Sequence, residues 1–117
     1  MPRPADRFLP LGPTVFNVLL ALADGEKHGY AIMREIRART GDALGTSTLY
    51  GIIKRLVEDE LIEECAERPD PALDDERRRY YQLTDLGRAV AVAESRRLEV
   101  TLGVARAKRL IPQTRTR

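Results

Sequence analysis

Residues 45–57 read GTSTLYGIIKRLV, and this stretch forms the most regular amphipathic pattern in the chain. Its apolar residues recur at the three- and four-residue spacing of one helix face: Leu49, Ile52, Ile53, Leu56 and Val57. The hydroxyl residues at the N-terminal end of this stretch and the basic pair Lys54-Arg55 fall on the other faces of the helix. Burial of the apolar stripe therefore fixes which face of this helix is available to a partner.

Two further helices are predicted ahead of this one. Residues 15–23 are apolar almost all round, which is typical of a buried helix. Helical spacing recurs over 29–40, and Gly41 is expected to close that second helix. A tight connection follows, after which Thr46 or Ser47 is expected to cap the third helix.

After the third helix the apolar period changes to that of strands. Residues 62–66 and 79–83 read as two strands of a hairpin, whose tip spans about 67–78. Pro69 and Pro71 favour an unpaired tip, because proline cannot donate to a strand ladder.

The order of elements predicts the fold. Two helices joined by a tight turn and followed by a two-stranded ribbon form a winged helix-turn-helix. Thr84 is expected to cap a last long helix, so the predicted fold class is mainly α (α+β) with a long C-terminal dimerisation helix. The predicted parts are an N-terminal arm (1–13) of irregular structure, the winged helix-turn-helix domain (14–83), the dimerisation helix (84–111) and a basic tail (112–117).

Composition excludes several classes of protein. Among 117 residues, 20 basic side chains against 18 acidic ones leave a net charge of +2, which excludes binding to nucleic acid through bulk charge. The single Cys65 and single His28 are too few for a disulfide framework or a Cys/His zinc site. His28 is expected to cap or pack, so we expect no enzyme, no metal and no cofactor. Short apolar runs and no secretory leader predict a cytoplasmic protein without a membrane segment.

The third helix carries groups that suit DNA on the face opposite its apolar stripe. Small hydroxyl residues at its N-terminus fit end-first entry into a major groove, where the free N–H groups also favour phosphate. Lysine and arginine reach phosphates or guanine edges, and a tyrosine hydroxyl can donate to phosphate. The candidate DNA contacts on this helix are Thr46, Ser47, Thr48, Tyr50, Gly51, Lys54 and Arg55.

The wing offers further candidate contacts, Arg78 and Arg79. Each phosphate that an arginine neutralises makes binding to duplex DNA more sensitive to salt. The acidic run over 74–76 lies beside these arginines and could pair with them instead, which would leave little net attraction.

Dimerisation is predicted from the last helix. A small winged domain cannot cover both sides of so long a helix, so part of it should face a partner chain. The alternative is that this helix folds back on its own domain. The predicted interface residues are Val90, Ala93, Leu98, Leu102 and Ala105.

Several separated motifs resemble the PadR-type transcriptional regulators. They span roughly residues 14 to 88, in the order that this family has them. The matching motifs are HGYAI (28–32), GTSTLY (45–50), KRL (54–56), LIE (61–63), RRYYQLT (78–84) and GR (87–88).

The resemblance implies a homodimeric repressor that binds double-stranded DNA at a pseudo-palindromic operator. It also implies release by a small-molecule effector or another signal. The chain length fits the short subgroup with a single helix after the wing. Two departures stand out: the chain has no tryptophan, which some members of that subgroup use to hold planar aromatic drugs, and Glu60 stands where the family usually has glycine.

A second hypothesis is a winged-helix protein-interaction module that does not bind DNA. The acidic wing tip and the near-neutral net charge favour it. Absence of duplex binding at low salt, together with a stable protein complex, would distinguish this module from the repressor.

Overall fold

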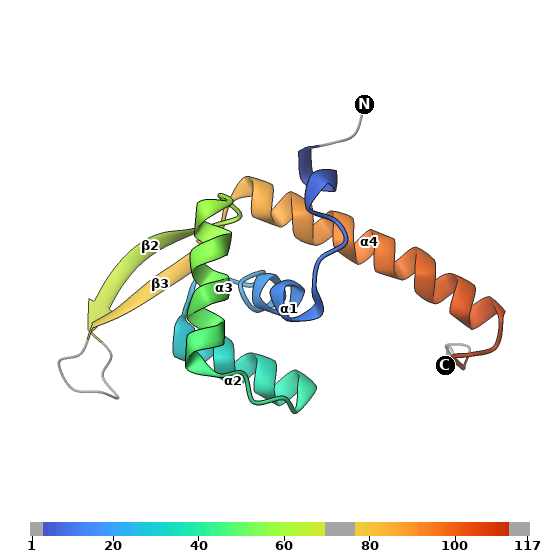
Figure 1. Ribbon diagram of the computed structural model, residues 1–117, viewed down its shortest axis with the longest axis horizontal. Helices are drawn as coiled ribbons and strands as arrows, with labels where there is room; N and C mark the ends of the chain where they lie inside the picture. The colour runs from blue at the N-terminus through green and yellow to red at the C-terminus, as the bar shows by residue number, and fades with distance from the viewer. Residues whose placement is uncertain (1–3, 70–76, 113–117) are drawn as a thin grey trace.

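The structure, a computed structural model, describes residues 4–69 and 77–112, and for 66–69, 77 and 78 the backbone alone. Its elements confirm the predicted mainly helical α+β winged helix with a long C-terminal helix (Figure 1). The wing is an antiparallel sheet of three strands, one more than in the predicted two-stranded ribbon. In chain order they are η1 (Pro4–Phe8), α1 (Pro13–Ala21), β1 (Lys27–His28), α2 (Gly29–Thr40), α3 (Thr46–Glu58), β2 (Ile62–Pro69), β3 (Arg77–Leu83) and α4 (Asp85–Ala107).

One apolar core joins the helices to the base of the wing. From α3 it takes the side chains of Leu49, Ile53 and Leu56, each at most 3% exposed, so the predicted stripe is confirmed at these positions. Ile52 is half-buried, and Val57 is 39% exposed because it lies at the edge of the stripe, in a groove toward the wing. The opposite face of α3 is therefore turned to solvent, as the stripe predicts.

The caps of α2 are as predicted, whereas the cap of α3 is not. His28 accepts a hydrogen bond from a first-turn N–H of α2 (3.2 Å), and Gly41 ends α2 with a left-handed φ of 77°. The prediction that Thr46 or Ser47 caps α3 is wrong. Gly45 is the cap residue, no side chain bonds there, and the first N–H groups of α3 are left for water or a ligand.

The wing is a three-stranded antiparallel sheet in the order β1-β3-β2. β2 and β3 pair from Ile62 opposite Leu83 as far as Pro69 opposite Arg77, with a bulge at Cys65. The prediction that the ribbon stops short of Pro69 is therefore wrong. Proline is tolerated there because β2 is an edge strand and Pro69 is its last residue.

A tight corner joins the end of α3, the wing and the start of α4. The Thr84 hydroxyl donates to the Glu60 carbonyl (2.6 Å) and accepts from the Gly87 N–H (2.9 Å), which confirms Thr84 as the cap of α4. Gly87 faces the Leu61 carbonyl so closely that a Cβ would lie 1.8 Å from its oxygen. Only glycine at this position allows α4 to approach the Leu61 backbone so closely.

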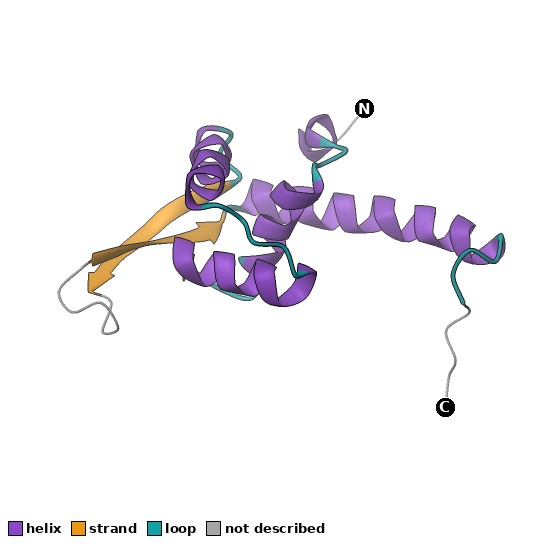
Figure 2. Cartoon of the chain, turned by 60° about the horizontal axis from the view of Figure 1, so that its bottom comes forward, coloured by secondary structure: helices purple, strands orange, loops and turns teal. Residues whose placement is uncertain are grey.

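The N-terminal arm packs against α4, and the prediction of an irregular arm is wrong for Pro4–Phe8, while residues 9–12 are irregular as predicted. Pro4–Phe8 forms a 3-10 helix, because a first-position proline costs such a short helix no hydrogen bond. Ala5 is buried in the core, and the Leu11 N–H donates to the Glu94 carboxylate on α4 (2.9 Å). The arm thereby lies across the first half of α4 (Figure 2).

Candidate nucleic-acid interface

The exposed face of α3 holds all the candidate DNA contacts that the sequence places on this helix. Each is exposed in the single chain: Thr46, Ser47, Thr48, Tyr50, Gly51, Lys54 and Arg55. The uncapped N-terminus brings the positive end of the helix dipole to the same place. The tip of α3 therefore combines hydroxyl groups with unpaired backbone donors, and the cations Lys54 and Arg55 lie about two turns further along the helix.

One flank of α3 faces the wing across a groove of about 340 Å³. Tyr50 and Lys54 line it from α3, and Arg79 lines it from β3. Arg79 Nε lies 3.8 Å from the Glu64 carboxylate, and because both side chains are largely exposed this pair is weak. The structure thus brings three of the candidate contacts together, with Arg79 held beside α3.

Tyr50 is anchored as well as exposed. Its hydroxyl end lies against Gly29 at the start of α2, where an added Cβ would come within 2.5 Å of the hydroxyl oxygen. The side chain is 41% exposed. Deeper in the groove Tyr81 is buried, and this burial raises the pKa of its phenol above the usual value.

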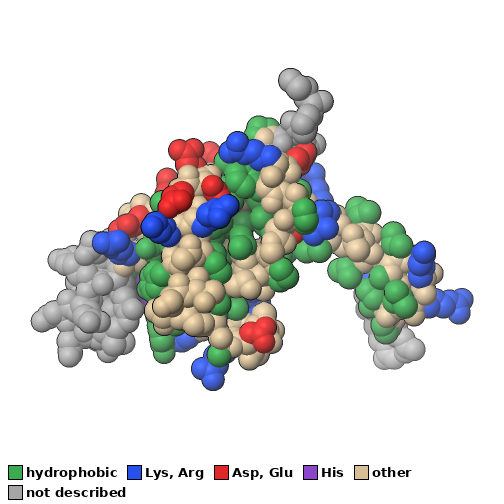
Figure 3. Space-filling view, in the orientation of Figure 1, with side chains coloured by type: hydrophobic (Ala, Val, Ile, Leu, Met, Phe, Trp, Pro, Cys, Tyr) green, Lys and Arg blue, Asp and Glu red, His purple; other side chains and the backbone are tan. Residues whose placement is uncertain are grey.

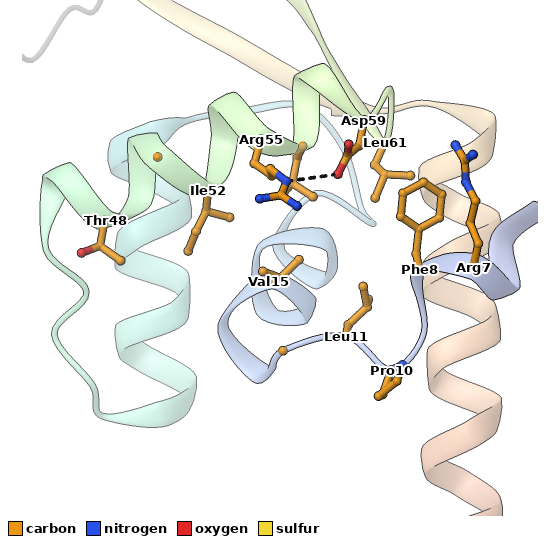
Figure 4. Close-up of a pocket in the computed structure, with 13 residues that line it drawn as sticks. Arg7, Phe8, Pro10, Leu11, Val15, Thr48, Ile52, Arg55, Asp59 and Leu61 are labelled. Atoms are coloured by element: carbon orange, nitrogen blue, oxygen red, sulfur yellow. Dashed lines mark ion pairs between the residues drawn. The ribbon is translucent and has the colours of Figure 1, made fainter.

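The other flank of α3 faces the N-terminal arm and α1. Thr48, Gly51 and Arg55 lie on this side, away from Tyr50 and Lys54, and line a second pocket (Figure 4). Arg55 Nε is 3.7 Å from an oxygen of Asp59, one helical turn on. The predicted contacts on α3 are thus divided between two flanks.

Part of the predicted wing contact lies outside the described residues. The side chain of Arg78 and the acidic run over 74–76 are not described, so only Arg79 can be placed. Its ion-pair partner among the described residues is Glu64 on the neighbouring strand.

The predicted dimer surface divides along α4. Val90 lies fully in the chain's own core, which leaves none of its surface to a partner, while Ala93, Leu98 and Ala105 are half-buried. Leu102 is 48% exposed, and further apolar side chains gather on the projecting half of the helix (Figure 3). Val100 and Val104 on this half are 70% and 52% exposed, and Leu110, just past the end of α4, is 79% exposed.

Sequence reasoning missed one buried ion pair. Glu94 is 1% exposed, and Arg97 donates to it at 2.5 and 3.1 Å. These bonds hold the pKa of Glu94 below its ordinary value, although burial opposes them. A signal was present, since Glu94 lies one turn from Val90 and from Leu98 on the apolar stripe of the helix.

The fold and the exposed tip of α3 define a winged helix-turn-helix protein. The sequence pattern of the transcriptional regulator PadR-like family matches residues 18–93, and the chain belongs to this family. This family consists of transcriptional regulators that bind DNA and are not enzymes.

Individual proteins are similar to the chain in sequence or in fold. The chain is 38% identical over 78 residues to an uncharacterized 37.1 kDa protein in transposon TN4556 of Streptomyces fradiae, and the match spans 67% of the chain but only 21% of that protein. A transcriptional regulator from Clostridium thermocellum is 25% identical (TM-score 0.64, 80% of this chain, 87% of that one). A PadR family transcription regulator from Clostridium difficile R20291 is 23% identical (TM-score 0.72, 82% and 97%) and shows the shared fold.

No helix within 4–69 or 77–112 has both the length and the apolar character that crossing a bilayer requires.

Proposed function

We propose that this chain is a dimeric, sequence-specific DNA-binding repressor of transcription, released from its operator by a small molecule or another signal. The observation that carries the proposal is the position of α3. Its apolar face is packed into the core, while its uncapped, hydroxyl-rich tip faces solvent and Lys54, further along the same helix, lines a groove with Arg79 of the wing.

In the proposed complex the tip of α3 enters a major groove. Ser47 and Thr48 bond to base edges or phosphates, and the first N–H groups of the helix donate hydrogen bonds to a phosphate oxygen. Lys54 and Arg79, on either side of the wing groove, neutralise phosphates and set the orientation of the duplex.

The dimer is proposed from the apolar side chains that the projecting half of α4 exposes. Leu102 is 48% exposed and Val100 is 70% exposed, and a helix with such a surface is stabilised when a second copy covers it. A two-fold dimer places two α3 tips on one side of the duplex, so the operator should be a pseudo-palindrome with half-sites about one helical turn apart.

The test begins with operator DNA recovered by the purified protein from a random genomic library. Lys54→Ala should weaken binding to that DNA and reduce the steepness of its salt dependence. With two copies per dimer and a slope of about 0.9 per phosphate contact, the slope should fall by about 2. Fluorescence anisotropy over a series of salt concentrations measures both quantities.

Arg96→Ala is the matched control, because it removes one exposed cation from α4 instead of α3. It should bind the operator as the wild type does. Equal losses in the two variants, or none in Lys54→Ala, would contradict the proposed contact. No duplex binding at low salt would instead favour the protein-interaction module. Repression is tested separately by placing the operator in a reporter promoter, whose transcription should fall when the protein is present.

A further inference from the structure

A pocket of about 590 Å³ lies between α3 and the N-terminal segment. Figure 4 shows Thr48, Ile52 and Arg55 of α3 along one wall, Phe8 along another and Val15 of α1 facing them. This volume is within the range of cavities that bind small molecules. The pocket belongs to the winged domain of one chain and includes none of the predicted dimer residues.

The inner surface of this pocket is apolar. Leu56 and Leu61 are at most 2% exposed, and Phe8, Leu11 and Ile52 are half-buried against the same core. An occupant must therefore present an apolar body to the pocket, because a polar one would lose its hydration without gaining hydrogen bonds.

The rim of the pocket is cationic. The Arg55 side chain is 80% exposed, and its Nε is 3.7 Å from Asp59, which is beyond hydrogen-bond distance. Its guanidinium lies between α3 and α1 in Figure 4. Arg7 is the second cation of the lining, and its guanidinium carbon lies 4.7 Å from the centre of the Phe8 ring. Arg7 lies on the far side of the Phe8 ring from Arg55 (Figure 4), so Arg55 is the cation placed beside the apolar wall to meet an anion, and Arg7 adds positive charge to the same rim.

From this combination we infer that the pocket binds a small amphipathic anion, an apolar molecule with one carboxylate or sulfonate, whose charged group bonds to Arg55. Arg55 can form a fork of two parallel hydrogen bonds with such a group, which a weak, exposed contact with Asp59 does not prevent.

A ligand in this pocket would affect DNA binding directly, an inference that rests on the proposed function. Thr48, Gly51 and Arg55 line the pocket and also belong to the DNA-contact face of α3. An anion on Arg55 takes the place of a phosphate, so ligand and operator exclude each other. The release then occurs at α3 itself and requires no rearrangement of the dimer.

The binding test uses anilinonaphthalene sulfonate as the probe, with uncharged phenylnaphthylamine, which shares its aromatic body, as the control ligand. Arg55→Gln should weaken binding of the sulfonate about tenfold and leave the uncharged dye unaffected. Lys54→Gln, a matched loss of charge on the other flank of α3, should leave sulfonate binding unchanged. Val15→Phe should weaken binding of both dyes, because the larger ring fills the pocket.

The site is mapped by amide chemical shifts on adding the sulfonate. Shifts centred on residues 11–12 and 51–52 support the pocket. Shifts confined to residues 98–107 overturn it, because the dye then binds the exposed apolar face of α4. Equal sulfonate affinity in the wild type and Arg55→Gln also overturns the proposed site. Because Arg55 is exposed, its substitution leaves the fold intact, so this comparison still tests the site if Val15→Phe fails to fold.

The competition test adds operator DNA. The sulfonate should displace the duplex from the wild type but at least tenfold less effectively from Val15→Phe, which should bind the operator normally. Equal displacement from both proteins, or none from the wild type, overturns the competition. A protein that binds no duplex contradicts the proposed function alone, since the sulfonate-binding test uses no DNA.

Discussion

At the residue scale, Glu60 has a backbone conformation that glycine adopts most easily. Its φ is 62°, and it follows α3 at the point where the chain turns toward the wing. The Glu60 N–H bonds to the Val57 carbonyl (3.0 Å) and the Leu61 N–H to the Leu56 carbonyl (2.9 Å). This pattern is a Schellman motif, whose left-handed residue is usually glycine, so the glutamate carries backbone strain.

Replacing that glutamate should therefore stabilise the protein. Glu60→Gly is expected to raise the free energy of unfolding by about 1 kcal/mol, because a side chain is disfavoured in the left-handed region. Urea unfolding at one fixed protein concentration measures the change. Glu60→Ala is the control, since it removes the carboxylate but keeps the Cβ. A gain of the same size in both variants would show that charge, not backbone strain, is responsible.

The residues of the candidate site were predictable to the extent that they follow the helical period. Leu49, Ile53 and Leu56 define the buried face, and the exposure of Lys54 and Arg55 follows from it. The contact of Tyr50 with Gly29 did not follow, because it joins two helices whose relative position the period does not specify.

At the scale of elements, one buried carboxylate adds a polar contact to the apolar packing of the N-terminal arm. The Glu94 side chain accepts hydrogen bonds from the Leu11 N–H and from Arg97, and so joins α4 to the arm. The arm in turn forms one wall of the pocket beside α3.

This contact makes stability depend on pH. Since the pKa of Glu94 is lowered in the fold, its ionised form stabilises the protein above the ordinary pKa of 4.5, and that contribution is lost as pH falls further through the lowered value. Glu94→Gln should cost about 1–2 kcal/mol at pH 7 and progressively less below pH 4.5. Urea unfolding across this pH range measures the difference.

Glu99→Gln is the control for that prediction, because Glu99 is an exposed carboxylate on the same helix. It should leave the pH dependence of the wild type unchanged. A loss in Glu94→Gln that is equally large at pH 3 would attribute the effect to packing rather than to ionisation.

The order and type of the helices and strands were predictable from the sequence. Two features were not, because they depend on how the elements are arranged in space. The extension of β2 to Pro69 depends on its place at the edge of the sheet. The arm packs on the core and bonds to α4 through Leu11 and Glu94, which are 83 residues apart. Contacts between residues so far apart in the chain cannot be predicted from the spacing of apolar residues within one helix or strand.

At the scale of the whole molecule, a winged domain stands at one end and half of α4 projects from it (Figure 1). Leu102 on this projecting half is 48% exposed. In the proposed dimer this surface is covered by the second copy, which joins two DNA-reading domains.

Leu102→Glu should therefore convert the dimer to a monomer, because a charge buried at the apolar interface is strongly unfavourable. Sedimentation equilibrium should give the 13.2 kDa mass of one chain in place of twice that mass. Operator affinity should also fall, since two linked half-site contacts become independent.

Val57→Glu is the control for this change. Val57 is similarly exposed, at 39%, but lies on α3 away from the projecting helix, so the substitution should leave the mass unchanged. A wild-type chain that sediments at 13.2 kDa would contradict the dimer directly.

The central claim, that the tip of α3 reads DNA in two copies, is tested most directly by tethered cleavage. An iron chelate attached at Ala43→Cys, in the exposed connection before α3 and with Cys65→Ser in the background, cuts DNA strands close to that tip. Two clusters of cuts are expected in the operator, related by its two-fold axis and separated by one helical turn of about 10 base pairs or a multiple of it. Evenly spread cuts, or cuts no stronger than those from a chelate at Glu99→Cys on α4, would contradict it.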